Sequence, residues 1–316
     1  MNNYSNNSYH TFLHPNQTYS SVFGQDLVAD VIEIPILSLT ILFAIVYTIL
    51  IFSRPVFRQN KFNWLTVNIC ISTVLLCINI LAMHAKQNDQ SSSINCRVRA
   101  FFLLSAVNQL MYSHCVAAVS RMLAIVHAKK SFSRSNTCLF ICISIGWLLA
   151  FLLSSINLFF DSYTCLQSPS TEFLSYYNLV TTLIIPIVII TVCNSRILRH
   201  VRQSTRQLRA QGTQPRLAHT RDMYLLKVMI VTFVVFFFGW TPVFLMQIFG
   251  VSVQFPEFLT IILRISPSVA MLHDTLFLIF TNKPVRLFIK QLVIRRRLKV
   301  PANVVAIFQQ QNRNQM

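Results

Sequence analysis

The side chains best suited to chemistry in this sequence are a few charged groups within or at the ends of long uncharged segments. Arg121 closes one such segment, and Arg264 and Asp274 lie inside another. The sequence shows no metal-ligand cluster, no nucleophile with a base at a useful spacing and no phosphate-binding loop. We therefore expect no enzyme activity, no cofactor and no metal. Ionisable groups in apolar surroundings instead indicate ligand binding or a conformational role.

The segments that must position these charges are too apolar for a soluble protein. Of the 316 residues, 54% are hydrophobic and 11% are charged, whereas soluble domains carry roughly 25% charged residues. Uncharged windows cover residues 34–52, 62–85, 100–120, 135–160, 173–195 and 228–256, and an equally apolar seventh window covers 258–282. Each can cross a hydrocarbon layer of roughly 30 Å as a helix, which satisfies its own backbone hydrogen bonds. The sequence predicts an all-α membrane protein, a seven-transmembrane helix bundle over residues 32–282.

The distribution of charge predicts the orientation of this bundle. The chain has 27 Lys and Arg against 9 Asp and Glu, an excess that in a soluble protein would suggest nucleic acid. If the N-terminus is extracellular, most of the basic residues fall in cytoplasmic segments and most of the acidic ones outside, as the positive-inside rule requires. We therefore expect a multi-pass protein of the plasma membrane that contacts lipids and not nucleic acid.

The two ends of the chain agree with this orientation. Asn3, Asn6 and Asn16 each begin an N-glycosylation acceptor, so we expect residues 1–31 to be extracellular, glycosylated and disordered. Residues 283–316 alternate apolar and basic side chains at first, which predicts a short amphipathic eighth helix and a basic cytoplasmic tail. No cleavable signal peptide is evident, so the first span is expected to direct membrane insertion.

The cysteines divide into two groups by predicted location. Six of the 8 fall within spans or at their inner ends, where a free cysteine behaves as a small apolar residue. Only Cys96 and Cys165 fall at predicted extracellular positions. Two cysteines near the outer surface predict one disulfide, which would join the loop after the fourth span to the start of the third.

Several motifs occur in the order found in one known family. Cys96 and Arg121 are separated by about 37 Å of helix, one membrane crossing. Ser120-Arg121-Met122-Leu123-Ala124-Ile125-Val126 resembles the end of the third helix of rhodopsin-like G-protein-coupled receptors, where Asp-Arg-Tyr is followed by Leu-Ala-Ile-Val. Further matches are Trp147 in the fourth span, Pro186 in the fifth, Phe236-Phe237-Phe238-Gly239-Trp240-Thr241-Pro242 in the sixth and Thr281-Asn282-Lys283 after the seventh. The resemblance covers about residues 32–294.

The chain also departs from the pattern of this family. Ile45 stands in place of an asparagine, Thr73 in place of the sodium-site aspartate, Ser120 in place of the acid before the arginine, Met122 in place of an aromatic, Asn194 in place of a tyrosine, and Asp274-Thr275-Leu276-Phe277-Leu278 in place of Asn-Pro-x-x-Tyr. These changes argue against a sodium-linked allosteric site and against the usual tyrosine rearrangements. The resemblance is to a divergent member.

The resemblance implies a receptor that passes an extracellular signal to a heterotrimeric G protein. Arg121 would then meet the G protein, and packing at Trp240 with a kink at Pro242 would let the sixth helix swing. Asp222 is the only acid of the inner segments, so we expect it to pair with Arg121 in the resting state. The alternative for Arg121 is a side chain that merely reaches the water at the membrane surface.

The expected ligand pocket lies in the outer half of the bundle. Arg264 should face the bundle, where it either meets a ligand carboxylate or pairs with Glu257 or Glu172. Arg99 would make the mouth of the pocket cationic, and Leu103 stands where amine receptors carry an aspartate, so a monoamine is not expected. No lysine lies in residues 258–282, so retinal is excluded as well. A peptide, slightly favoured by resemblance, or a small acidic molecule remains.

Three points stay open from the sequence alone. Asp274 either hydrogen-bonds to a polar group such as Thr73 or has a functional role. The chain could be a seven-span transporter or channel, although the internal repeats that such folds usually show are not visible. It could also be a receptor-like protein that no longer couples, since several motifs are changed.

Overall fold

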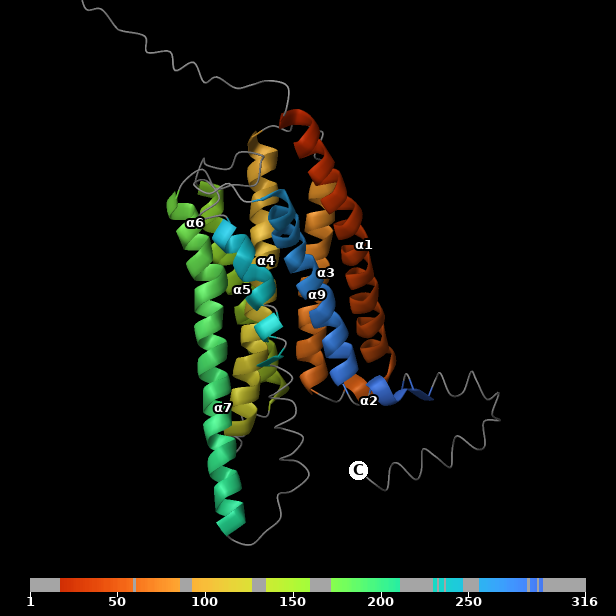
Figure 1. Cartoon of the computed structure of the whole chain (residues 1–316). Helices are drawn as coiled ribbons and strands as arrows, with labels where there is room; N and C mark the ends of the chain where they lie inside the picture. Colours follow the sequence, from red (N-terminus) through yellow and green to blue (C-terminus); the bar gives the residue numbers. More distant parts are fainter. Residues whose placement is uncertain are drawn as a thin grey trace, which may run out of the picture.

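A computed structural model describes residues 18–58, 61–85, 93–126, 135–159, 172–210 and 256–282, together with parts of 230–246 and of 285–291. All of its regular structure in these ranges is helical. The helices are α1 (Thr18–Ser53), α2 (Pro55–Arg58), α3 (Lys61–Ala85), α4 (Ser93–Val126), α5 (Asn136–Phe159), α6 (Glu172–Leu179), α7 (Ile185–Ala210) and α9 (Glu257–Thr281), with a π-helical turn at Val180–Ile184 between α6 and α7. The long helices run side by side as a bundle (Figure 1).

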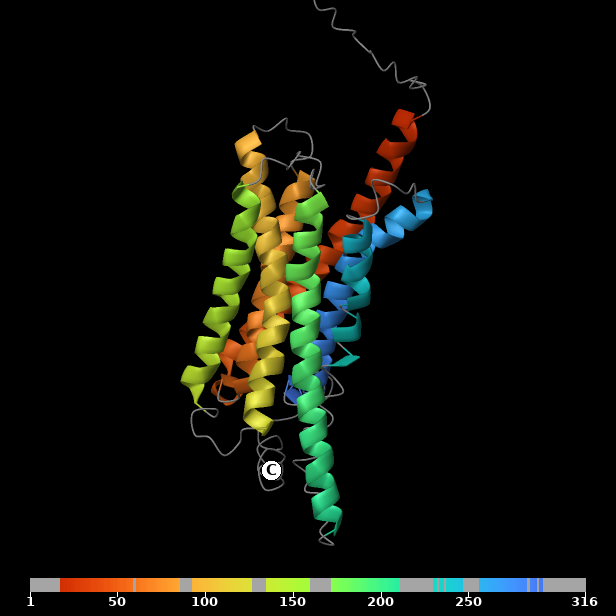
Figure 2. The same ribbon diagram turned by 90° about the vertical axis from the view of Figure 1, so that its left-hand side faces the viewer.

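Six of the predicted spans are helices long and apolar enough to cross a membrane. They cover Val31–Ser53, Asn63–His84, Arg97–Val126, Asn136–Phe159, Phe173–Arg206 and Phe258–Thr281. The predicted sixth span is represented by a shorter apolar helix, Phe233–Met246. The prediction of an all-helical membrane bundle is therefore confirmed, and Figure 2 shows its elongated helices from a second side.

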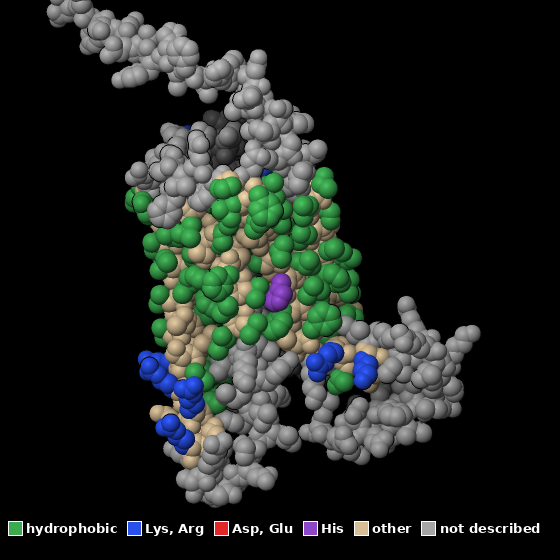
Figure 3. Space-filling model, in the orientation of Figure 1, with side chains coloured by type: hydrophobic (Ala, Val, Ile, Leu, Met, Phe, Trp, Pro, Cys, Tyr) green, Lys and Arg blue, Asp and Glu red, His purple; other side chains and the backbone are tan. Residues whose placement is uncertain are grey.

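The outside of the bundle matches a membrane environment. A band of apolar side chains covers the bundle, and Lys and Arg gather beyond one end of it (Figure 3). The exposed basic residues of the C-terminal half of α7 are Arg196, Arg199, Arg202 and Arg206, and the chain beyond α9 adds the exposed Arg286 and Lys290. This separation is what the positive-inside rule predicts for the cytoplasmic side.

The central helix of the bundle is α4. It packs against α3, α5 and α7, and its middle section is almost completely buried. That section carries polar side chains, which need partners in an apolar interior. Asn68 donates to Ser113 at 2.9 Å, and Trp147 donates to Asn68 at 3.0 Å, so α3, α4 and α5 are joined by one hydrogen-bonded chain.

The π-helical turn before α7 also forms a hydrogen bond with α4. Pro186 has no N–H, and the N–H of Ile185 bonds to Val180 O five residues back instead of to Thr181 O. The Tyr112 hydroxyl donates to this Thr181 carbonyl at 3.0 Å. The loss of helical bonding near the proline is therefore compensated from the neighbouring helix.

Two details of the helices differ from the sequence expectations. Helix α1 begins at Thr18, inside the segment that we expected to be disordered, so it is longer than its span. Ile45, which stands in place of a helix-one asparagine in the family pattern, is 42% exposed, whereas Ala44 and Tyr47 beside it are fully buried. The polar contact at this level comes from the Tyr47 hydroxyl, which accepts a hydrogen bond from Asn282 at 2.7 Å.

Candidate functional site

A buried carboxylate near one end of the bundle joins three helices. Glu33 on α1 is 5% exposed, and its Oε1 accepts a hydrogen bond of 2.6 Å from Ser268 on α9. Its Oε2 lies 3.4 Å from His84 Nε2 on α3 and 3.9 Å from Arg264 Nε on α9. We call these four residues the outer cluster. It compensates a charge that would be costly to bury alone.

The outer cluster gives Arg264 a partner that the sequence analysis did not name. We considered Glu257, Glu172 and a ligand carboxylate; the side chains of both glutamates lie outside the described residues. The guanidinium meets Glu33 at the limit of ion-pair distance, and its side chain is 32% exposed. Arg264 therefore keeps accessible surface while it neutralises Glu33.

A second acid–base contact lies deeper in the bundle. His114 Nε2 on α4 is 3.3 Å from Asp274 Oδ2 on α9, and the two side chains are 7% and 3% exposed. We call these two residues the core pair. Thr73 was one possible partner of Asp274, but among the described contacts its hydroxyl donates to Ile69 O at 3.0 Å.

The aromatic residue predicted to act in the sixth span is at the centre of the apolar core. Trp240 is 5% exposed and belongs to the same cluster as Leu110 of α4 and Met271 of α9. Phe244 packs one turn away, with ring centroids 6.3 Å apart. Pro242 lies half-buried in the same helix, where a proline removes one backbone hydrogen bond. A change in side-chain packing at Trp240 would thus alter contacts of three helices: its own helix, α4 and α9.

The helix Phe233–Met246 and α9 approach each other very closely at Gly239. A Cβ atom at this position would lie 2.4 Å from the Cβ of Ala270, well inside van der Waals contact. Ser266 Oγ lies 2.8 Å from Gly239 O and 2.9 Å from Leu263 O, the carbonyl left without its helical donor by Pro267. The glycine is needed for this approach, and the bond from Ser266 to Gly239 O joins the two helices at the same level.

Arg121 lies in the last two turns of α4. Its Nε atom is buried, although the residue as a whole is only partly buried. Next to it, Met122 and Ile125 pack against Ile197 and Val201 of α7. The proposed partner Asp222 lies outside the described residues.

The other predicted site residues are only partly placed. Arg99 and Leu103 are half-buried on the N-terminal half of α4, and Leu103 packs against the main core. Cys96 is in α4, but its side chain, like Cys165 and the acceptors Asn3, Asn6 and Asn16, lies outside the description. Among the described cysteines six are free thiols: Cys70, Cys77, Cys115, Cys138, Cys142 and Cys193.

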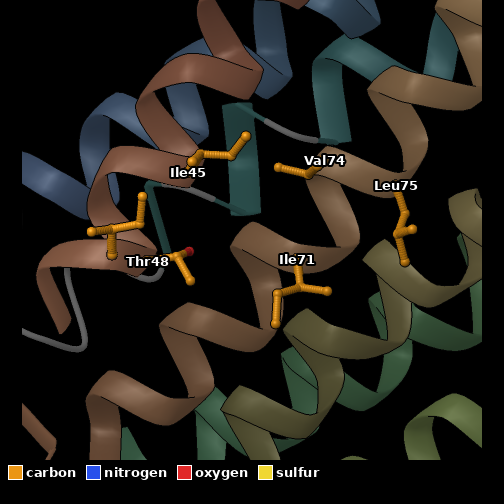
Figure 4. Close-up of a pocket in the computed structure, with 6 residues that line it drawn as sticks. Ile45, Thr48, Ile71, Val74 and Leu75 are labelled. Carbon is orange, nitrogen blue, oxygen red and sulfur yellow. The ribbon is translucent and has the colours of Figure 1, made fainter. Parts of the chain in front are cut away.

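A shallow groove of about 190 Å³ lies on the side of the bundle, between α1 and α3. Its lining is Ile45, Thr48, Ile49, Ile71, Val74 and Leu75 (Figure 4). The one hydroxyl there, that of Thr48, already donates to Ala44 O at 2.8 Å. The groove therefore offers no polar recognition, and it faces outward at the level of the apolar band. In the described ranges no three His, Cys, Asp or Glu side chains could hold a metal ion.

Four residues of these contacts were not expected from the sequence: Glu33, Ser268, His84 and His114. Glu33 directly precedes the first uncharged window, so a search for charge-free segments ends just after it. His84 and His114 carry no formal charge, so they do not interrupt the uncharged windows 62–85 and 100–120. A search for histidines inside apolar helices would have found both, because a buried imidazole needs a partner.

These observations define a multi-pass helical membrane protein with buried acid–base contacts at two depths and an arginine at one helix end. The profile described as "7 transmembrane receptor (rhodopsin family)" matches residues 43–276, and the chain belongs to this family. Its members are receptors rather than enzymes. No curated protein matches the chain.

Proposed function

We propose that this protein is a plasma-membrane receptor that converts binding of an extracellular ligand into activation of a heterotrimeric G protein. Its N-terminus is extracellular and its basic end is cytoplasmic. The observation that carries the proposal is the order of three groups along the bundle, which form the signalling path of this proposal. Arg264 on α9 lies in the outer cluster near one end, Trp240 lies in the buried core that α4 and α9 share, and Arg121 lies near the other end of α4.

The ligand in this proposal is a peptide or a small acidic molecule that enters the outer half of the bundle. Arg264 supports an acidic group, because a third of its side chain is exposed and its ion pair with Glu33 is long. A ligand carboxylate can take two parallel hydrogen bonds from a guanidinium, which Glu33 does not take here. Arg99 adds positive charge on the same half of α4, and Leu103 offers no counter-charge to an amine.

Ligand binding acts through the sixth helix. Changed packing around Trp240 would tilt the helix Phe233–Met246 at Pro242 and move its inner end away from Arg121. An Arg121–Asp222 latch would oppose this movement by about 1 kcal/mol or less, since such a pair is partly solvated. The exposed arginines of α7 would meet anionic lipid headgroups or the acidic surface of the partner.

The test is a G-protein activation assay in cells, without ligand and with a library of peptides and small carboxylic acids. We expect Arg121→Ala to abolish activation at unchanged surface expression. Arg58→Ala removes another cation at the inner end of the bundle and serves as the matched control. Equal activity of Arg121→Ala and wild-type protein would contradict the proposed role of Arg121.

The altered motifs favour one alternative, a receptor-like protein that binds its ligand but does not couple. Ser120 removes the acid beside Arg121, and the Asn-Pro-x-x-Tyr sequence is absent. In that case no G protein would be activated by any variant, whereas ligand binding would persist. A transporter or channel would instead give ligand-dependent flux in the same cells.

A further inference from the structure

Within the described ranges, the core pair is a direct polar contact between α9 and the central helix α4. Of the labelled helices, α9 packs chiefly against α1 and touches α3 only lightly, whereas α4 packs against α3, α5 and α7. The side chains of His114 and Asp274 bridge the space between α9 and α4 at 3.3 Å. Their contact therefore limits how far α9 can move relative to α4.

Asp274 depends strongly on His114. The carboxylate is almost fully buried, and its Oδ1 accepts no hydrogen bond from the part of the chain that the structure describes. A buried carboxylate without compensation is strongly unfavourable. Separation of α9 from α4 at this level therefore requires a new partner for Asp274, such as water entering the bundle.

The core pair lies between the two ends of the signalling path. His114 is one turn inward of Leu110, and Asp274 is one turn inward of Met271; both of these apolar residues pack in the cluster of Trp240. His114 is also two turns, roughly 10 Å, outward of Arg121 on the same helix. The core pair therefore lies between Leu110, at the level of the Trp240 cluster, and Arg121 along α4.

The helix Phe233–Met246 cannot move far without moving α9. The close approach at Gly239 and Ala270 and the bond from Ser266 join the two helices at the level of Trp240. Movement of the sixth helix therefore pulls α9 at Ala270, one turn from Asp274. Such a movement would lengthen the contact between Asp274 and His114.

We propose that the core pair is a pin that holds α9 to α4 in the resting receptor and opens on activation. This rests on the proposed function. In this proposal the conformation described is the resting one, in which the side chains of His114 and Asp274 lie 3.3 Å apart. Loss of either partner shifts the population toward the open state and raises signalling without ligand.

The experiment compares the single variants His114→Leu and Asp274→Asn with the exchanged variant His114→Asp/Asp274→His. Basal G-protein activation is normalised to surface expression. Amide hydrogen exchange of α9 and of Phe233–Met246 is measured in parallel on full-length protein in nanodiscs. We expect each single variant to raise basal activation at least threefold and to speed exchange in both helices. The exchanged pair should return both values toward wild type.

Thr182→Val is the matched control. It breaks another buried bond of α4, the 2.7 Å bond from Thr182 to Asn108, which does not involve α9. We expect a lower thermal stability with unchanged basal activation and unchanged exchange in α9. A similar effect of Thr182→Val on signalling would show that any loosening of α4 suffices and would overturn the pin.

The outcomes separate the pin from the proposed function. If the single variants change neither exchange nor basal activation, or the exchanged pair restores nothing, the pin is wrong. If exchange changes and recovers as expected while no variant, including wild type, activates a G protein, the pin stands and the coupling function fails.

Discussion

At the scale of single residues, buried charges near α9 decide how this bundle holds together. Glu33 and Asp274 are both nearly inaccessible, and both face a histidine from a different helix. Glu33 has two further partners, whereas Asp274 relies on His114 at one oxygen. The outer cluster is therefore expected to hold its three helices together in both states. The core pair, with fewer contacts, is expected to separate on activation.

Replacement of Glu33 tests the outer cluster. Glu33→Gln leaves His84 and Arg264 without their carboxylate, so we expect the free energy of unfolding to fall by about 1–3 kcal/mol. Arg264→Gln should cost less, about 1 kcal/mol or below, because its side chain is a third exposed and its ion pair is long. Thermal unfolding can be followed with a thiol-reactive dye, since cysteines such as Cys70 and Cys77 are buried until the bundle opens. A larger effect at Arg264 than at Glu33 would contradict the cluster as described.

Gly239 is the most sensitive small residue. Gly239→Ala places a Cβ 2.4 Å from the Cβ of Ala270, and the required separation of the two helices should cost about 1–3 kcal/mol. Gly146→Ala is the control, because its nearest contact at 2.8 Å is with a side-chain methyl of Val116, which can shift. We expect a lower unfolding temperature for Gly239→Ala than for Gly146→Ala. Equal temperatures would argue against the close approach.

At the scale of helices, the π-helical turn before α7 shows how one proline is accommodated. Tyr112→Phe removes the donor to Thr181 O and leaves a buried carbonyl without it, so a loss of about 1 kcal/mol is expected. Tyr177→Phe removes a bond of the same length, to Leu153 O, at a less buried position and should cost less. The same thermal assay distinguishes them. If both variants match wild type, the Tyr112 hydroxyl does not compensate the turn.

The helices themselves could be predicted from sequence because span length is set by membrane thickness. Phe62–Ala85, for example, was expected from the absence of charge over residues 62–85, and the helix is Lys61–Ala85. The π-helical turn could not be predicted, although Pro186 was noticed, because it depends on Tyr112 of another helix. The partner of Arg264 could not be predicted either, since Glu33 is distant in sequence and adjacent only in the bundle.

At the scale of the whole molecule, the predicted disulfide would fix the outer surface. We expect Cys96→Ser and Cys165→Ser to reduce surface expression to the same degree, and the double variant to be no worse than either single one, because one bond is lost in each case. Flow cytometry of intact cells measures this. A much greater loss in the double variant would show that the two cysteines act independently.

The account as a whole requires that the N-terminus and Arg121 lie on opposite sides of the membrane. The direct measurement is antibody labelling of epitope tags at the two chain ends, before and after the cells are permeabilised. We expect the N-terminal tag to be labelled on intact cells and the C-terminal tag only after permeabilisation. Labelling of both tags on intact cells, or of neither, would contradict seven crossings and with them the proposed receptor.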